Sequence, residues 1–293
     1  MSESAIPVFQ NVELFCFFLS IAVLSMWELR TPLRQLMLGV PLRWLNNIGL
    51  FLFNSVLMRL LSPTLSIVLA FQLQEQGWGL FNVLVLPEWM AVVGAFILLD
   101  FGFYLKHRIA HGVPWFWRFH RVHHSDADFD LTTSIRFHPL DVGYQTLTQI
   151  LSVIIIGAPP LAIAAHAVCF MVIARFQHSN VRLPEKLEKK LRRFLVTSDM
   201  HRIHHSARQP ETDSNYGGLF PWFDRLLGTY VDEPVGGQTG MQVGLNEFSH
   251  PKHMTLWWML VNPLLPGKTA VDDAGPAEAG DESPGLPGQL PSG

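Results

Sequence analysis

Apolar segments that recur along the chain limit its possible folds more than any other feature. They lie at residues 13–27, 47–71, 90–105, 142–157 and 160–176. Only 15% of the 293 residues are charged, whereas a soluble domain carries about 25%, so the chain has too few charges to cover a water-facing surface. The last two segments are shorter than the ~20 residues of a straight span and are expected to form a hairpin. We therefore expect an all-α integral membrane helical bundle with about four to five membrane segments.

The distribution of basic residues gives this bundle an orientation. If the segments cross in turn, the loops 28–46 and 106–141 and the chain after residue 176 share one side. All but two of the 21 Lys and Arg residues lie on that side, and the loops on the other side contain none. Because cytoplasmic loops carry the excess of basic residues, we expect this side to be cytoplasmic, in a multi-pass protein of a bacterial inner membrane.

Histidines are concentrated in two short blocks on the side predicted to be cytoplasmic. Residues 106–125 contain five of them, and residues 199–206 contain three more. Their spacings are HxxxH, HxxHH and HxxHH, and residues three or four apart share one face of a helix. Facing helices of a bundle build metal sites in this way. The eight histidines are His107, His111, His120, His123, His124, His201, His204 and His205. We expect them to lie in a cytoplasmic helical cap.

The number and type of these side chains restrict the metal chemistry. Imidazole suits Zn, Fe, Cu and Ni, and the two isolated cysteines, Cys16 and Cys169, make no CxxC site. A zinc ion takes four ligands, or three plus water when it is catalytic, so eight histidines are too many for one ion. The HExxH pattern of zinc proteases is absent. An all-nitrogen site for two metal ions beside a bilayer points to iron and dioxygen chemistry on a lipid.

The phrases around the histidines resemble the fatty acid hydroxylase (sterol desaturase) superfamily, whose members are integral-membrane non-haem di-iron oxygenases. The resemblance covers about residues 98–230. It rests on DFGFYLKHRIAH (100–111), FHRVHHS (119–125), TTSIRFHP (132–139), FQHSNV (176–181), DMHRIHHS (199–206) and NYGGLFPWFDRLLGTY (215–230). It implies that the eight histidines bind two iron ions. Members often recruit further histidines from between these motifs, and here His178 and His138 are the candidates.

Two further residues are candidate catalytic side chains. Asp100 and Tyr104 continue the helical stripe of His107 and His111, at positions i, i+4, i+7 and i+11. An acid inside a membrane segment is a functional candidate, and Asp100 is expected to accept the second N–H of a ligand histidine. Asp199 and Asp224 rank below it, as residues that orient an imidazole or pair with an arginine. The other histidines, His166, His250 and His253, are expected to have structural or surface roles.

The predicted activity is hydroxylation or desaturation of a lipid C–H bond with O2 and two external electrons. The chain carries no flavin or dinucleotide fingerprint, no cysteine set for an iron–sulfur cluster and no haem-binding extension. A separate reductase, ferredoxin or cytochrome is therefore expected to supply the electrons, and the basic segment 184–195 could help to dock it. No basic run with interleaved aromatic residues suggests nucleic acid. The alternatives are a zinc-dependent membrane hydrolase and a metal transporter or storage protein.

The chain is expected to form one domain. Residues 1–266 would make up a membrane-embedded oxygenase domain, because its apolar segments and histidine blocks depend on each other. From residue 267 to residue 293 the sequence is rich in Gly, Pro and acidic residues, a composition that is typical of disorder.

Overall fold

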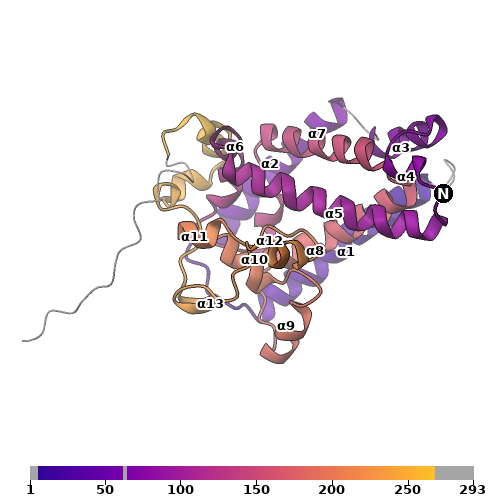
Figure 1. The fold of residues 1–293 in the computed structure, drawn as a ribbon. Helices are drawn as coiled ribbons and strands as arrows, with labels where there is room; N and C mark the ends of the chain where they lie inside the picture. Colours follow the sequence, from indigo (N-terminus) through magenta and orange to yellow (C-terminus); the bar gives the residue numbers. More distant parts are fainter. Residues whose placement is uncertain (1–5, 62–64, 268–293) are drawn as a thin grey trace, which may run out of the picture.

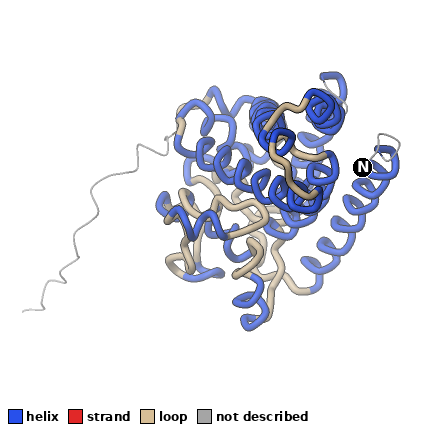
Figure 2. The backbone as a smooth tube through the Cα atoms, turned by 45° about the vertical axis from the view of Figure 1, so that its right-hand side comes forward, coloured by secondary structure: helices blue, strands red, loops and turns tan. Residues whose placement is uncertain are grey.

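The computed structural model describes residues 6–61 and 65–267, and these residues form helices and loops (Figure 2). Within this part of the chain, β pairing is limited to two isolated bridges, Pro32 with Val181 and Ser206 with Val243. The expected all-α fold is confirmed. The predicted tail lies outside the described residues, apart from Gly267, and the single domain at 1–266 stays a prediction.

Four helices are long and apolar enough to cross a membrane. They are α1 (Ile6–Arg30), α5 (Glu88–Gly112), α7 (Pro139–Ile156) and α8 (Pro160–His178). Large apolar side chains on their outer faces remain exposed, among them Phe15 at 66% and Ile155 at 71%. Such surface is unfavourable in water and favourable against lipid. The expectation of a multi-pass membrane bundle is confirmed. Helices α7 and α8 follow one another across the turn at Gly157, and each packs against α5.

The predicted segment 47–71 is not a single helix. The structure places α2 at Val40–Leu61 and α3 at Leu65–Gln76, and residues 62–64 lie outside the described residues. Neither helix is among the four candidate spans, so this segment differs from the prediction in its continuity and in its length.

The two ends of the bundle carry different elements. Figure 1 shows the start of α1, α3 and α4 (Leu80–Val83) at one end, and α6 (Pro114–His124) and α10 (Ser198–His204) toward the other. At the first end, Gly79 and Gly157 have φ angles of 94° and 62° and lie so close that a Cβ on either would overlap the other's backbone. This contact holds the α7–α8 turn away from the histidine motifs, as the predicted topology requires.

Short elements form a cap around the histidine end of the bundle. They are the 3₁₀ helices η2 (Leu131–Ile135), η3 (Asn246–Phe248), η4 (Pro251–Met254) and η5 (Asn262–Leu264), and the α-helices α9 (Glu185–Leu191), α11 (Gln209–Thr212), α12 (Trp222–Leu227), α13 (Gly237–Gly240) and α14 (Leu256–Val261). The basic segment 184–195 is helical only over α9. In α14, Met259 packs against Leu50 and Val122, so one side of this helix faces protein.

A buried ion-pair network joins α2 to the loop that follows α6. The Arg43 guanidinium donates from Nε to Asp126 at 2.7 Å and from Nη1 to Asp130 at 2.6 Å. Thr133 Oγ1 also donates to Asp126. Burial disfavours the carboxylate form of Asp126, but the Arg43 charge and its hydrogen bonds outweigh burial and lower the pKa of Asp126 to about 2. The loop that leaves the second histidine motif is thereby tied to α2.

Replacing Arg43 with Met should destabilise the protein strongly, because two buried carboxylates would lose their counter-charge. Breaking a buried pair in this way costs about 3–5 kcal/mol. Arg118→Met, at an exposed position of α6, is the control and should change stability by less than about 0.5 kcal/mol. Thermal unfolding of the purified protein in detergent measures both. Equal melting temperatures of the two variants would contradict the role given to Arg43.

Candidate metal centre

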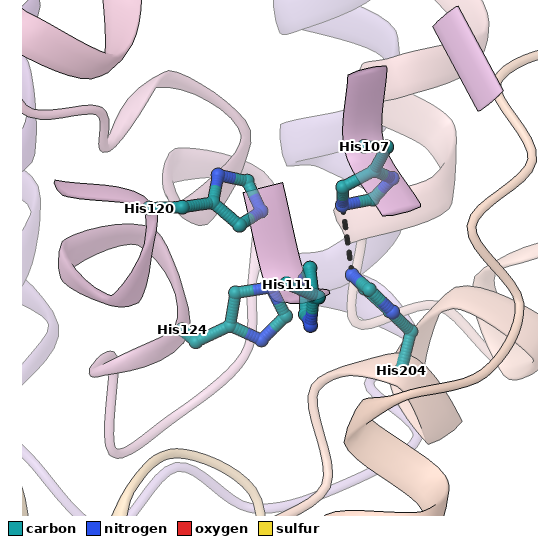
Figure 3. A group of neighbouring side chains, drawn as sticks. All are labelled: His107, His111, His120, His124 and His204. Carbon is teal, nitrogen blue, oxygen red and sulfur yellow. Dashed lines mark hydrogen bonds between the residues drawn. The ribbon is translucent and has the colours of Figure 1, made fainter. Parts of the chain in front are cut away.

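Nine buried histidines form two neighbouring groups. The first group contains His107 and His111 from α5, His120 and His124 from α6, and His204 from α10 (Figure 3). The second group contains His123 from α6, His178 at the end of α8, and His201 and His205 from α10 and its C-terminus. Within each group the possible ligand atoms lie within 4.8 Å of one another. The structure thus brings together the eight histidines of the predicted motifs and His178.

Helix geometry explains why each HxxHH motif is divided between the two groups. Residues four apart share a helix face, whereas adjacent residues point about 100° apart. On α6, His120 and His124 face the first group, and His123 faces the second. On α10 the division is reversed, since His201 and His205 belong to the second group and His204 to the first. The two helices therefore connect the groups, and each contributes to both.

Hydrogen bonds at Nδ1 fix the tautomer of several rings in the first group. His107 Nδ1 lies 2.9 Å from the Tyr216 carbonyl oxygen, and His204 Nδ1 lies 2.7 Å from the Ser214 carbonyl oxygen. A carbonyl oxygen only accepts, so both Nδ1 atoms carry the proton, and in a neutral ring Nε2 then carries a lone pair. Burial, with the neighbouring His120 adding to it, lowers the pKa of His204 to about 3, so this ring is neutral.

The lone pairs that result point at one another. His107 Nε2 and His204 Nε2 are 2.9 Å apart, the contact that Figure 3 marks with a dashed line. Two bare nitrogens cannot share a hydrogen bond, and at this distance their lone pairs repel. A cation between them would turn the repulsion into two favourable contacts. This geometry is what metal-binding imidazoles require, with Nδ1 held by an acceptor and Nε2 free.

Carboxylates hold two more rings of the first group in the same tautomer. His120 Nδ1 lies 3.1 Å from Asp141 Oδ2, and His111 Nδ1 lies 3.2 Å from Asp213 Oδ1. The Nε2 atoms of both rings are buried and have no hydrogen-bond partner. Buried polar atoms without partners are rare and need an explanation. A metal ion bound by these nitrogens provides one.

The second group has the same character. His178 Nδ1 lies 2.6 Å from the Ala174 carbonyl oxygen, so its bare Nε2 faces His123 Nε2 at 3.1 Å and His201 Nε2 at 3.0 Å. Burial, and secondarily the neighbouring histidines, lower the pKa of His123, His201 and His205 well below the usual value. Neutral imidazole is the form that binds a metal. Both groups therefore fit a metal ion held by nitrogen ligands.

His138, which the sequence places among the candidate ligands, lies outside both groups. It is the N-cap of α7, where its Nδ1 accepts a hydrogen bond from the Leu140 N–H at 3.1 Å. Its Nε2 lies 3.2 Å from the Leu260 carbonyl oxygen. Both ring nitrogens are therefore occupied by backbone groups, and the ring links the start of α7 to α14.

Asp100 and Tyr104 hold a loop and do not touch the grouped imidazoles. Asp100 accepts hydrogen bonds from the Leu219 and Phe220 N–H groups at 2.8 and 3.1 Å, and Tyr104 Oη pairs with Thr229 Oγ1 at 3.0 Å. The expectation that Asp100 would orient a ligand histidine is corrected. The histidine beside it is His166, which lies outside the groups, with its Nε2 3.7 Å away.

Asp100, Tyr104, His107 and His111 do lie along one face of α5, as predicted. The segment 213–229 packs against this face. From Asp100 to His111 the stripe is buried, and the segment supplies the groups that it contacts. Asp224 shapes this segment by accepting from the Tyr216 and Gly217 N–H groups. Gly218 lies so close to α5 that a Cβ would approach Asp100 Oδ1 to 2.7 Å. The segment positions the carbonyl groups that fix the tautomers of His107 and His204.

Sequence reasoning missed the two carboxylates that contact grouped histidines. Asp141 stands in the motif TTSIRFHPLD, and Asp213 precedes the motif that begins at Asn215. Their only signal in the sequence was this proximity to family motifs. Asp199, a predicted lower-ranked candidate, pairs with Arg202 at 2.8 Å, one of the roles expected for it.

Comparisons with known proteins agree with this arrangement. A family model described as "Fatty acid hydroxylase" matches residues 92–229, which contain all nine grouped histidines. The alkylglycerol monooxygenase of Xenopus tropicalis is 30% identical over 227 residues, which are 73% of this chain and 49% of that protein. An ornithine lipid hydroxylase of Rhizobium tropici is 31% identical over 158 residues, 54% of this chain and 46% of that protein. The chain spans about half the length of these curated relatives. No solved structure matches it.

The division into two groups predicts how much metal the protein retains when different pairs of histidines are replaced. In His178→Ala/His205→Ala, the second group keeps two imidazoles and the first keeps five, so the purified protein should hold about one metal ion per chain. In His204→Ala/His205→Ala each group loses one ligand, so both sites should weaken and neither should be lost outright. Elemental analysis after graded chelation measures the difference. Loss of all metal from the first variant would show one shared site in place of two.

Proposed function

The chain belongs to the fatty acid hydroxylase family, and from this membership and the two histidine groups we propose that it is a membrane-bound non-haem di-iron oxygenase. Its substrate is a lipid, in which it hydroxylates or desaturates a C–H bond with O2. The cofactor is a pair of iron ions, one for each histidine group. Two electrons per turnover come from a separate donor, a reductase, ferredoxin or cytochrome.

The observation that most directly supports this proposal is that two groups made up only of histidines lie side by side. Both α6 and α10 contribute histidines to each group. Because His123 and His124 are adjacent and belong to different groups, as do His204 and His205, the two sites are neighbours. Two bound iron ions would supply the reduction of O2 and the oxidation of an unactivated C–H bond. A lone zinc site of a hydrolase needs three or four ligands and leaves at least five of the nine grouped histidines unexplained.

The protein's own residues hold the site in place and keep water away from it. Asp141, Asp213 and the backbone carbonyl groups keep the proton on Nδ1 of their histidines. The Phe137 ring stacks on His123 with centroids 4.4 Å apart, and the Trp117 ring lies 4.8 Å from that of His111. Asp100 and Tyr104 act as positioning residues, since they fasten the segment 213–229 to α5.

A lipid substrate is supported by the relatives and by the membrane helices. Two relatives are named for lipids, as an alkylglycerol monooxygenase and an ornithine lipid hydroxylase. The histidine motifs lie at the ends of the candidate spans α5 and α8, which supports a substrate that comes from the bilayer. The concentration of Lys and Arg on the histidine side supports a cytoplasmic orientation, with the inner membrane of a bacterium as the proposed location.

Anaerobic purification followed by elemental analysis tests the cofactor. We expect about two iron ions per chain, because there are two groups of buried imidazole ligands. Adding a chemical reductant and air should then start O2 uptake. One tightly held zinc ion per chain, together with no O2 uptake, would support the zinc-dependent hydrolase and overturn the oxygenase.

Lipid analysis tests the reaction. Membranes that contain the protein, supplied with reductant and isotopically labelled O2, should yield a lipid that has gained one labelled oxygen atom or has lost two hydrogen atoms. His123→Ala/His124→Ala removes a ligand from each group and should abolish the change. His250→Ala, at an exposed position away from the site, is the control and should retain it. Mass spectra that are identical for the active protein and the double variant would contradict the ligand assignment.

A further inference from the structure

A largely apolar cavity of about 90 Å³ lies against both histidine groups. Its wall includes His107 and His120 of the first group and His123, His178 and His201 of the second. The aromatic rings of Phe103, Phe137 and Phe170 also line it. A molecule in this cavity would touch both groups, so this is where a substrate carbon would meet the metal centre.

A second cavity of about 410 Å³ adjoins the first. Side chains of α1, α3, α5, α7 and α8 line it, including Ile67 and Ile163. The two cavities share Phe103, Lys106 and Phe170 as wall residues, and the two phenylalanine rings are 4.4 Å apart. Because four of these five helices are candidate spans, the second cavity lies at membrane depth, where a hydrocarbon chain is stable.

Lys106 provides the only Lys or Arg side chain among the described residues that line the two cavities. Its ammonium lies 4.7 Å from the centroid of the Phe103 ring, and no carboxylate of the described residues forms an ion pair with it. Asp141, in the wall of the first cavity, uses its Oδ2 to accept from His120 Nδ1 and Gln145 Nε2. The Asp141 carboxylate is near enough to act on the Lys106 charge but forms no ion pair with it. The ammonium is therefore left to pair directly with an anion that enters the cavity.

We propose that Lys106 binds the anionic group, a carboxylate or a phosphate, of a lipid substrate whose hydrocarbon chain occupies the second cavity. This inference rests on the proposed function, because it assigns the lipid class on which the oxygenase acts. Lys106 would then determine specificity, since it holds the charged end of the lipid beside the histidine groups. Glu13 lines the second cavity, and a carboxylate there disfavours the reverse orientation.

Binding of three lipids with the same acyl chain tests the proposal. The probes are tritiated palmitate, palmitoyl lysophosphatidate and uncharged monopalmitoylglycerol, bound to the metal-loaded protein in neutral detergent and measured by scintillation proximity. The protein should bind at least one anionic probe roughly 10- to 100-fold more tightly than the neutral one, which is the range of a hydrogen bond to a charged group. The preferred anion identifies the source as a carboxylate or a phosphate.

Variants at position 106 distinguish the effect of the Lys106 charge on lipid binding from the effect of its size. Lys106→Met should remove the preference for the anion and leave the affinity for monopalmitoylglycerol unchanged within about twofold, whereas Lys106→Arg should keep most of the preference. Lys252→Met is the matched control, because Lys252 also lies over an aromatic ring, that of Trp258 at 5.2 Å, but lines neither cavity. Equal binding of all three probes by the unmodified protein would overturn the proposal, as would an equal loss for all probes in Lys106→Met.

These outcomes are independent of the proposed reaction. Binding requires neither O2 nor an electron donor, so a selective, Lys106-dependent affinity for anionic lipid would stand even if no oxidised product forms. In the opposite case, a protein that oxidises lipids without this preference would keep the proposed function and lose the role of Lys106. The metal content of Lys106→Met should equal that of the unmodified protein, which separates loss of charge from damage at the neighbouring His107.

Discussion

Repulsion among buried imidazole lone pairs is the constraint on which the rest of this structure depends. Nine buried rings share one space, and the Nε2 atoms of several approach one another to about 3 Å, as between His107 and His204 at 2.9 Å. Burial prevents the rings from relieving this repulsion by taking up protons. A bound cation would relieve it, so packing that is unfavourable for the imidazoles alone is favourable for a metal centre.

The fold keeps these rings from turning away. Each ring with a fixed tautomer has a hydrogen-bond acceptor near its Nδ1. These acceptors lie in different parts of the chain, such as the carbonyl groups of Ala174 in α8 and of Ser214 after α11. The segment 213–229 in turn is fastened to α5 by Asp100 and Tyr104. The buried Arg43 network ties down the loop after α6. The polar contacts around the two groups therefore keep the imidazole rings in a fixed orientation.

The proposed oxygenase function also depends on where this centre lies. The apolar helices end at the histidine groups, so the ligands lie at the junction between lipid and cap. Two cavities meet there at Phe103, Lys106 and Phe170. One contacts the ligands and the other lies among the membrane helices, which gives a lipid a route to the metal centre without passing through water. A lysine at the junction adds a means of choosing among lipids.

The sequence by itself determined the membrane bundle, the common end of the histidine motifs and most members of the two histidine groups. These features follow from local patterns, because hydropathy and i, i+4 spacing are properties of single helices. Tertiary structure alone decided that each HxxHH motif divides between two groups, since the partners of His123 and His124 come from different helices. It also decided that His138 caps α7 and that Asp100 holds the backbone at Leu219. A polar residue's spacing shows which way it faces on its own helix, whereas its partner depends on which segment folds against that face.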